Sequence, residues 1–336
     1  MKILVTGGAG YIGGTVAGLL AENGHKVTVF DNLSHGRREL VPSGVEFVEG
    51  ELADRPALEN IFISAKDQGV PFDGVLHFAA LIEAGESMVR PEIFFRNNTA
   101  CTLSLLEAIL AHGPRRLVFS STAAVYGEPE VVPIKEDARL LPTNAYGESK
   151  LLVEHMLGWF NRIHGLHSAS LRYFNVAGAP EGPGGITRGE AHEPESHLIP
   201  LVLDVALERR KSIKIFGEDY PTPDGTCIRD YIHVSDLADA HLLALSALET
   251  APAAASRLIF NLGNGQGFSV REVIESARRV TGHPIPAEVC PRRAGDPAVL
   301  VASSEKAIRE LGWKPKYTQL DEIIRTAWIW HQKRYA

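Results

Sequence analysis

A glycine-rich segment near the amino terminus constrains the fold more than any other feature of the sequence. Residues 6–13 read TGGAGYIG and lie between an apolar run, Lys2 to Val5, and a helix-like stretch, Tyr11 to Glu22. Glycines between a strand and a helix let the backbone turn tightly and approach a pyrophosphate, whose charge then meets the helix N-terminus. A plain tight turn would use the same residues, but this position favours dinucleotide binding.

A carboxylate follows at the spacing that such a site requires. A second strand, Lys26 to Phe30, leads into Asp31, roughly 20 residues past the loop, where a carboxylate accepts hydrogen bonds from a ribose diol. The carboxylate repels the additional phosphate of NADP, although Arg37 and Arg38 weaken that argument slightly. A strand-end turn would also suit Asp31 and Asn32, but the loop upstream favours a cofactor role, and we expect NAD.

Short apolar runs alternate with helix-like stretches through the first half of the chain. Parallel strands that are buried on both faces have this pattern. We therefore expect an α/β fold with a doubly wound parallel sheet of the Rossmann type. Further strands are expected at Val45 to Val48, Asp73 to Phe78, Arg116 to Ser120 and Ser168 to Tyr173, and helices at Pro91 to Ala111 and Ala145 to His164.

The composition changes after Val176. Residues 178–200 hold many Gly, Pro, His and Glu and little apolar periodicity, which predicts a long functional loop. Beyond it we expect a smaller mixed α/β lobe over the strand ends, with a strand at Ile213 to Phe216 and helices at Pro200 to Arg209, Asp236 to Ala247, Val270 to Val280 and Ser304 to Leu311. The expected division assigns residues 1–176 to the NAD-binding domain, with 231–262 returning to it, and residues 177–230 and 263–336 to the substrate lobe.

Composition argues against several classes of function. The chain has 34 basic and 41 acidic residues and no long basic run, so we expect no nucleic-acid partner. No segment approaches the ~20 apolar residues of a membrane helix, so no membrane association is expected. Cys101, Cys227 and Cys290 are far apart and odd in number, which favours a reduced cytoplasmic setting over a disulfide framework or a zinc site. We expect no metal.

Tyr146 and Lys150 are four residues apart on the expected helix, so their side chains share a face. A phenol titrates near ~10, and a neighbouring ammonium lowers that pKa, so such a tyrosine is suited to act as a base towards a sugar hydroxyl. Thr122 stands at the end of the preceding strand and can exchange a hydrogen bond with the same hydroxyl. An amphipathic surface pair is the alternative explanation for the tyrosine and the lysine.

Longer motifs carry a resemblance. TGGAGYIG, VLHFAA, VFSSTAAVYG, YGESK and LRYFNVAG occur in the order found in extended short-chain dehydrogenases/reductases, which the chain resembles. The second half adds HLIPLVLDVAL, IFGEDYPTPDGTCIRDYIHVSDLADAH, FNLGNGQGFSV and RRAGDPAVLVAS, which resemble the UDP-glucose 4-epimerase family. The resemblance implies a homodimeric isomerase that interconverts UDP-glucose and UDP-galactose by reversible hydride transfer at the sugar 4-position to bound NAD.

The same resemblance implies a role for each matching position. Tyr146 is expected to be the acid/base, Lys150 its partner and a ligand of the nicotinamide ribose, and Thr122 the bridge to the sugar hydroxyl. The expected cofactor residues are Gly7, Gly10, Tyr11, Ile12, Gly13, Asp31, Asn32, Glu51, Leu52, Phe78, Ala79, Ala80, Asn98, Tyr146, Lys150 and Tyr173. The expected UDP-sugar residues are Thr122, Tyr146, Asn175, His197, Leu198, Arg229, Arg292, Asp296 and Leu300.

Some positions depart from the family pattern or have another explanation. Glu51 stands where the family often has an aspartate, and it must fold back to reach an adenine. Ile82 stands where some members carry a lysine, and His197 stands where others carry an asparagine. Arg229 has Asp230 as an alternative partner to a UDP diphosphate. Leu300 is smaller than the tyrosine of some family members, which predicts room for N-acetylated sugars, although a strand core residue is the alternative explanation.

Three other functions compete with the epimerase. A 4,6-dehydratase needs an acid pair after Thr122, where Ala123 and Ala124 stand. An epimerase acting on UDP-glucuronate needs an additional cation for the carboxylate, which the sequence does not exclude. A non-catalytic NAD-binding scaffold predicts a broken catalytic set, whereas Thr122, Tyr146 and Lys150 are all present.

Overall fold

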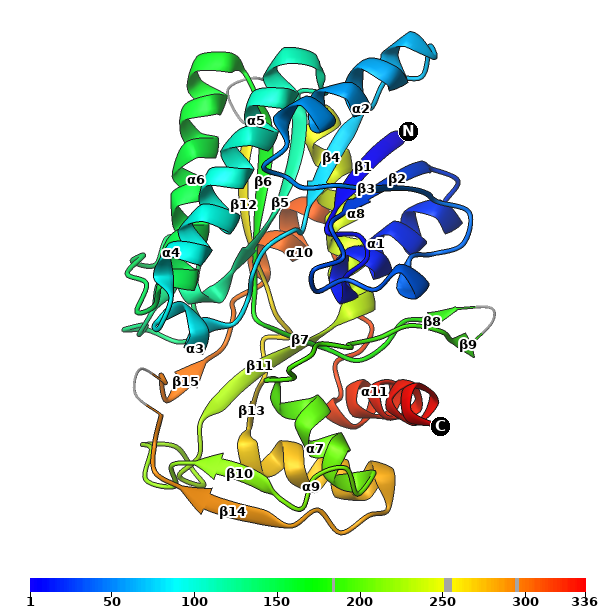
Figure 1. Cartoon of the computed structure of the whole chain (residues 1–336). Helices are drawn as coiled ribbons and strands as arrows, with labels where there is room; N and C mark the ends of the chain where they lie inside the picture. Colours follow the sequence, from blue (N-terminus) through cyan, green and yellow to red (C-terminus); the bar gives the residue numbers. More distant parts are fainter. Residues whose placement is uncertain (183–184, 251–255, 294–295) are drawn as a thin grey trace.

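The larger half of the molecule is built on one parallel sheet (Figure 1). This computed structural model describes residues 1–182, 185–250, 256–293 and 296–336. The strand order is β12-β6-β5-β4-β1-β2-β3, and all neighbours pair in parallel. The strands are β1 (Lys2–Thr6), β2 (Lys26–Asp31), β3 (Glu46–Glu49), β4 (Gly74–His77), β5 (Arg116–Thr122), β6 (His167–Tyr173) and β12 (Arg257–Leu262). The prediction of a doubly wound Rossmann sheet is confirmed.

Helices cover both faces of this sheet because successive strand residues point to opposite sides. Ile3 and Val5 of β1 pack in one core with α1 (Tyr11–Glu22) and α8 (Val234–Thr250). Leu4, between them, packs in a second core with α2 (Arg55–Asp67), α5 (Cys101–His112) and α6 (Ala145–His164). The strand ends therefore lie between two helical layers, which fixes their position.

The segment expected to be one helix at Pro91 to Ala111 is helical but not uniform. It consists of α4 (Pro91–Phe94), a π-helical stretch η2 (Phe95–Ala100) and α5. A short helix α3 (Ala84–Ser87) precedes it. The π-helical stretch contains Asn98, whose buried side chain faces the segment after β4. Single-turn π-helical irregularities of this kind are frequent at functional sites.

In the described residues, the smaller half combines three small sheets and several helices. Strand β11 (Ile228–His233) pairs with β7 (Asn175–Ala177), β13 (Gly267–Ser269) and β15 (Val299–Leu300). Strands β10 (Ile213–Phe216) and β14 (Ala287–Cys290) form a parallel pair, and β8 (Glu181–Gly182) pairs with β9 (Gly185–Ile186). The helices are α7 (Leu198–Ala206), α9 (Val270–Thr281), α10 (Glu305–Leu311) and α11 (Leu320–Tyr335).

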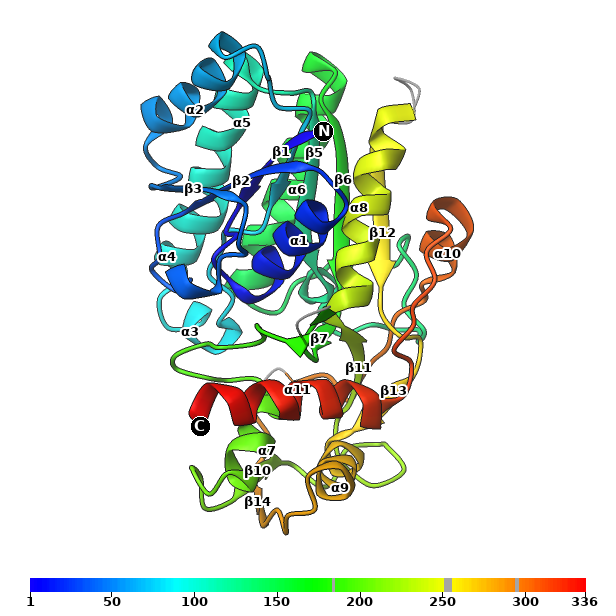
Figure 2. The same ribbon diagram turned by 90° about the vertical axis from the view of Figure 1, so that its right-hand side faces the viewer.

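The chain passes between the two halves more than once. Strand β12 closes one edge of the large sheet, and α8 packs in its core beside α1. Trp313 and Ala307, far along the chain, belong to the same core. Figure 2 shows that α11, the last helix of the chain, does not join this core but lies next to α7 and α9 in the smaller half. None of the helices in the described parts of the chain has the length and apolar character needed to cross a membrane.

Candidate active site

A pocket lies at the carboxyl ends of the central strands of the large sheet. Its walls come from the glycine-rich turn after β1, the ends of β2 and β5, the first turns of α6 and the loop before α7. All the predicted cofactor residues except Asn98 line it, namely Gly7, Gly10, Tyr11, Ile12, Gly13, Asp31, Asn32, Glu51, Leu52, Phe78, Ala79, Ala80, Tyr146, Lys150 and Tyr173.

The glycine-rich turn forms a cradle that larger residues would fill. Gly7 has a φ of 74°, and a Cβ there would lie 2.5 Å from the amide nitrogen of Ala79. A Cβ on Gly13 would lie 2.3 Å from the carbonyl oxygen of Gly7. Gly10 precedes α1 without a side-chain cap from the described residues, which leaves the helix N-terminus to interact with an anion. These features fit a bound pyrophosphate.

Asp31 is held in the pocket at the end of β2. Its Oδ2 accepts a hydrogen bond from the Ala9 amide at 3.0 Å, and its Oδ1 accepts one from the Leu33 amide at 2.8 Å. Burial raises the pKa of this carboxyl, and the two backbone hydrogen bonds oppose that shift. The nearby cations are engaged elsewhere, because Arg37 pairs with Glu193 at 2.6 Å and Arg38 lies over the Phe47 ring. The electrostatics therefore favour a free ribose diol over a phosphate.

Asn98 holds the segment after β4 in place from the side that faces away from the pocket. Its Oδ1 accepts a hydrogen bond from the Leu81 amide at 2.8 Å, and its Nδ2 donates to the Leu81 carbonyl at 2.9 Å. A further bond, 3.1 Å long, joins its Nδ2 to Ser149 Oγ on α6. The residue thus ties the segment after β4 to α6, and it positions Ala79 and Ala80 without lining the pocket itself.

Tyr146, Lys150 and Thr122 meet where α6 starts and β5 ends. Asn144 caps α6 by accepting a hydrogen bond from the Gly147 amide at 2.8 Å, which fixes the turn that carries Tyr146. Lys150 is 3% exposed, and its Nζ donates to the Ser120 carbonyl at 2.9 Å. Thr122 is 8% exposed and shares a hydrogen bond with the Tyr146 hydroxyl. The arrangement brings a phenol, a hydroxyl and an amine to one side of the pocket.

The titration of this group differs from the prediction made from sequence. The surrounding protein raises the pKa of Tyr146 to about 12, and the hydrogen bond from Thr122 only partly opposes this. Burial also lowers the pKa of Lys150 to about 7. The expected lowering of the tyrosine pKa is therefore wrong for the protein chain alone, because desolvation outweighs the hydrogen bond from Thr122.

A buried ion pair that the sequence did not indicate supports the end of β5. Arg172 of β6 donates to both carboxylate oxygens of Glu154 on α6, at 2.9 and 2.6 Å. Ser121 Oγ also donates to Glu154 Oε1 at 2.6 Å. Removing one partner of a buried pair leaves an uncompensated charge and is strongly destabilising. The network anchors the strand that presents Thr122 to the helix that presents Tyr146.

The predicted sugar-nucleotide residues divide into two groups. Asn175, His197 and Leu300 line the pocket, and Leu198 is the first residue of α7. Arg229, Arg292 and Asp296 are not part of the lining among the described residues. Arg292 pairs with Asp219 at 2.6 Å and lies over the Tyr220 ring.

Arg229 has a different partner from the one considered at first. Its guanidinium lies 3.9 Å from Asp296 and donates to the Ile228 carbonyl at 2.9 Å. Asp230 instead accepts hydrogen bonds from backbone amides, and burial raises its pKa to about 6. The alternative explanation that Asp230 is the partner of Arg229 is therefore wrong. Residues 294–295, in the segment that carries Arg292 and Asp296, lie outside the described residues.

Comparison with known proteins identifies the family. The model of the NAD dependent epimerase/dehydratase family matches residues 3–263. A UDP-glucose 4-epimerase of Corynebacterium glutamicum is 53% identical over 328 residues, which cover 98% of this chain and 95% of that protein. This chain belongs to the NAD-dependent epimerase/dehydratase family.

Solved structures of this family have the same fold. A crystal structure of a UDP-glucose 4-epimerase superposes with a TM-score of 0.93 at 49% identity, covering 100% of this chain and 98% of that chain. A UDP-glucose-4-epimerase of Stenotrophomonas maltophila, with bound NAD and formylated UDP-arabinopyranose, gives a TM-score of 0.92 at 39% identity and covers both chains completely. NAD is accordingly the cofactor of this chain, and the glycine cradle and Asp31 fit it.

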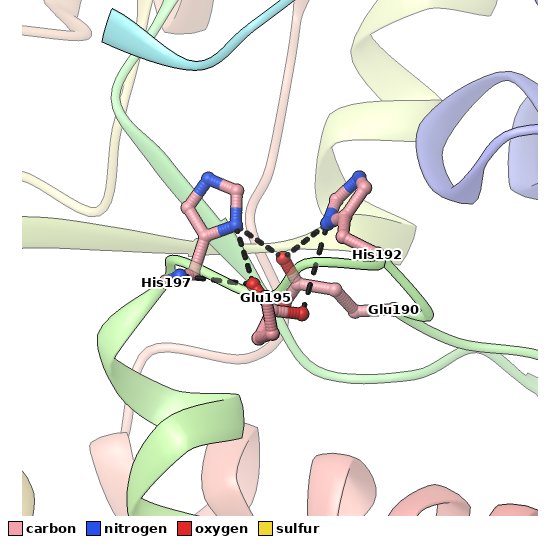
Figure 3. A group of neighbouring side chains, drawn as sticks. All are labelled: Glu190, His192, Glu195 and His197. Carbon is pink, nitrogen blue, oxygen red and sulfur yellow. Dashed lines mark hydrogen bonds and ion pairs between the residues drawn. The ribbon is translucent and has the colours of Figure 1, made fainter. Parts of the chain in front are cut away.

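Three residues beside His197, namely Glu190, His192 and Glu195, were not singled out from the sequence of this family member. Glu190, His192, Glu195 and His197 lie together on the loop before α7 (Figure 3). Burial lowers the pKa of His192, but hydrogen bonds with Glu190 and Glu195 outweigh this and raise it to about 9. The signal in the sequence was the repeated spacing of glutamate and histidine, E-x-H-x-x-E-x-H.

Proposed function

We propose that this chain is an NAD-dependent isomerase that interconverts UDP-glucose and UDP-galactose by inverting the sugar at carbon 4. The observation that carries the proposal is the complete set of Thr122, Tyr146 and Lys150 in one pocket with the glycine cradle. UDP-glucose 4-epimerases with close sequence and structural similarity support it. A non-catalytic NAD-binding scaffold would not need to retain this set.

The mechanism follows from where the polar groups lie. NAD, when bound, would supply the acceptor for the hydride that leaves carbon 4 as its C–H bond breaks, and the donor that returns a hydride to the same carbon. Tyr146 takes the proton of the sugar 4-hydroxyl, while Thr122 holds that hydroxyl in line with the phenol oxygen. The 4-keto sugar then turns about its link to the diphosphate and presents its other face. Tyr146 gives the proton back, and Lys150 stabilises the phenolate during the cycle.

The remaining assignments are also part of the proposal. Residues 1–176 with 231–262 would hold NAD, and residues 177–230 and 263–336 would form the lobe that holds the UDP-sugar. Arg229, Arg292 and Asp296 would exchange their present ion pairs for contacts with UDP. The proposed UDP-sugar residues that line the pocket or flank it are Thr122, Tyr146, Asn175, His197, Leu198 and Leu300.

The decisive experiment is incubation of the purified protein with UDP-galactose, followed by chromatographic detection of the products. We expect UDP-glucose to form until the two UDP-sugars reach equilibrium. The reverse reaction, started from UDP-glucose, should reach the same ratio of the two. Turnover of UDP-glucuronate without turnover of UDP-galactose would reassign the substrate. No turnover of any UDP-sugar by NAD-loaded protein would support the scaffold.

N-acetylated sugars form a second proposed substrate class. Leu300 lines the pocket on the two-residue strand β15, beside Arg229 of β11, whereas its neighbour Val301 is buried at 7% exposure. An acetamido group needs additional volume while the keto sugar turns. Leu300 is smaller than the tyrosine of some family members, so the pocket should accept N-acetylated sugars. UDP-N-acetylgalactosamine should therefore be converted as well.

We further propose that the enzyme is a cytoplasmic homodimer that associates through α5 and α6. Three large apolar side chains on these helices are exposed to solvent, namely Leu103 at 38%, Trp159 at 58% and Ile163 at 64%. Large apolar side chains that remain exposed on two packed helices would be covered if those helices met a second copy of the chain. Light scattering after size-exclusion chromatography tests this, and Trp159→Glu should shift the mass towards that of the monomer.

A further inference from the structure

Four side chains between β9 and α7 have the composition and geometry of a metal site. Glu190, His192, Glu195 and His197 each offer one ligand atom, and these atoms all lie within 4.8 Å of one another. Figure 3 shows both imidazoles turning their Nδ1 atoms towards the two carboxylates. Among the residues that the structure describes, no second group of three or more histidine, cysteine, aspartate or glutamate side chains meets the same geometry.

The distances fit a small tetrahedral coordination sphere. Bonds of ~2.0–2.1 Å to a tetrahedral zinc ion place adjacent ligand atoms about 3.3 Å apart. Glu190 Oε1 lies 2.7 Å from the Nδ1 of His197 and 3.1 Å from that of His192. Glu195 Oε1 lies 3.1 Å from the Nδ1 of His197, and the other oxygen, Oε2, lies 3.8 Å from the Nδ1 of His192. All four distances lie within about 0.6 Å of the expected separation.

Hydrogen bonding alone satisfies the cluster incompletely. An imidazole carries at most one hydrogen on Nδ1, so His197 cannot donate a linear hydrogen bond to both carboxylates at once. The Oε2 atom of Glu195 is shielded from solvent and has no hydrogen-bond partner among the described residues. Two neighbouring carboxylates need positive charge beside them, which protonated imidazoles or a bound cation can supply. A central cation would satisfy the imidazoles and the carboxylates at once, because it needs no hydrogen on either Nδ1.

The backbone that carries these ligands is held by other parts of the chain. Trp330 Nε1 on α11 donates to the Glu190 carbonyl at 2.8 Å, and its ring lies where a Cβ on Gly189 would be. Arg334 and Arg37 both pair with Glu193, at 2.9 and 2.6 Å. A loop that is fixed in this way loses less conformational freedom when it binds a ligand.

We propose that Glu190, His192, Glu195 and His197 bind one divalent transition-metal ion of the zinc class. Two imidazole nitrogens with two carboxylate oxygens favour zinc over magnesium or calcium, which prefer oxygen ligands alone. The site is structural, because all four positions of a tetrahedral ion are filled by protein atoms. The proposal is independent of the epimerase reaction.

The ion would organise one edge of the pocket. His197 immediately precedes α7 as its N-cap residue, and it lines the pocket with Glu190 and His192. Figure 3 shows the Nε2 atoms on the far side of the rings from the carboxylates. Metal binding through Nδ1 fixes the tautomer and leaves Nε2–H as a donor. The ion would therefore hold the His197 ring in a fixed orientation, in which its Nε2–H can donate a hydrogen bond to a ligand in the pocket.

The test uses the full chain purified without a histidine tag. Elemental analysis by mass spectrometry should find about one zinc ion per chain, and chelator-treated protein should bind added Zn²⁺ saturably in calorimetry. Co²⁺ should replace zinc and give the intense visible absorption of a tetrahedral ion. A wild-type protein that neither contains nor saturably binds Zn²⁺, or that shows only the weak spectrum of octahedral Co²⁺, would overturn the proposal.

Variants locate the site. His192→Ala and Glu195→Gln should each weaken Zn²⁺ binding by at least the ~10- to 100-fold that loss of a supporting group typically causes. His155→Ala, on the exposed face of α6, is the matched control and should bind as the wild type does. Zn²⁺ should also raise the melting temperature of the wild type more than that of the two variants. Unchanged affinity in both variants contradicts the assignment, and if they fail to fold, the wild-type cobalt spectrum decides.

Discussion

The two walls of the pocket are built in different ways. One wall carries Gly7, Asp31 and Thr122 at the ends of parallel strands, whose register is fixed by backbone hydrogen bonds and buried apolar side chains. The other carries His197 and Leu300 on a loop and a two-residue strand, and its charged groups are held by one another. The first wall suits chemistry that needs fixed distances, and the second suits a sugar that must turn.

The largest effect is expected on the sheet side, from Tyr146→Phe. The change removes one hydroxyl from the residue that we propose as the acid/base, and such groups typically contribute ~100- to 10,000-fold to the rate. Steady-state assays with UDP-galactose measure the loss. Tyr317→Phe, which removes a hydroxyl that bonds to Glu181 in the smaller half, is the matched control and should remain active. A Tyr146→Phe rate above a tenth of the wild-type rate would show that another group carries the proton.

Lys150→Ala should have a smaller effect that depends on pH. The active form of Tyr146 is the phenolate, which exists above the tyrosine pKa. Below its own pKa of about 7, Lys150 is an ammonium that stabilises the phenolate and lowers the tyrosine pKa. Without the lysine that pKa rises, so the rate falls and the pH optimum moves upward; each unit lowers the phenolate fraction about tenfold. Profiles of kcat/KM against pH test this, with Lys316→Ala as an exposed control. An unchanged optimum would remove Lys150 from this role.

Asp31→Ser tests the cofactor end of the same wall. The wild type should release NAD when denatured, and the variant should bind NAD about tenfold or more weakly, because hydrogen bonds to a charged group are lost. Discrimination against NADP should fall with it. Asp67→Ser on the surface of α2 is the control. Finding NADP as the main dinucleotide in the wild type would contradict the electrostatic argument.

The smallest effect is expected on the other wall, from Leu300→Tyr. The larger ring should reduce turnover of UDP-N-acetylgalactosamine about tenfold relative to UDP-galactose, since small volume changes in a pocket discriminate weakly. Leu300→Met conserves volume and should leave the ratio unchanged. If the wild type fails to convert the acetylated sugar, or the tyrosine variant loses both activities equally, the volume argument does not hold.

The contrast between the walls also decided what the sequence was able to predict. The turn at residues 6–13 and Asp31 are constrained by local backbone geometry at fixed spacing, so their positions in the pocket followed from the pattern. Arg229 and Arg292 depend on partners far away in the chain, Asp296 and Asp219, which no local pattern specifies. The raised pKa of Tyr146 depends on how fully the protein surrounds it.

Two helices show a different kind of omission. Neither α2 nor α11 was predicted, although Leu320, Ile323, Ile324 and Trp328 have the spacing of an amphipathic helix and are buried. Strand β12 was not predicted as a strand, although it lies within residues 231–262, which were expected to return to the NAD-binding domain. The E-x-H-x-x-E-x-H spacing was interpreted as loop composition, because these residues lie in an irregular segment without the periodicity of a helix or strand.

Helix α8 and strand β12 return from the smaller half to the large sheet, which affects how the chain folds during synthesis. The first six strands of the large sheet emerge within 173 residues, but the edge beside β6 stays open until β12 has been made. The core around Ile3 and Val5 also waits for α8 and Trp313. An unpaired edge strand with exposed apolar side chains is prone to aggregation. The nascent chain is therefore most vulnerable over a long stretch of translation, and a fragment ending after β7 would retain that vulnerability permanently.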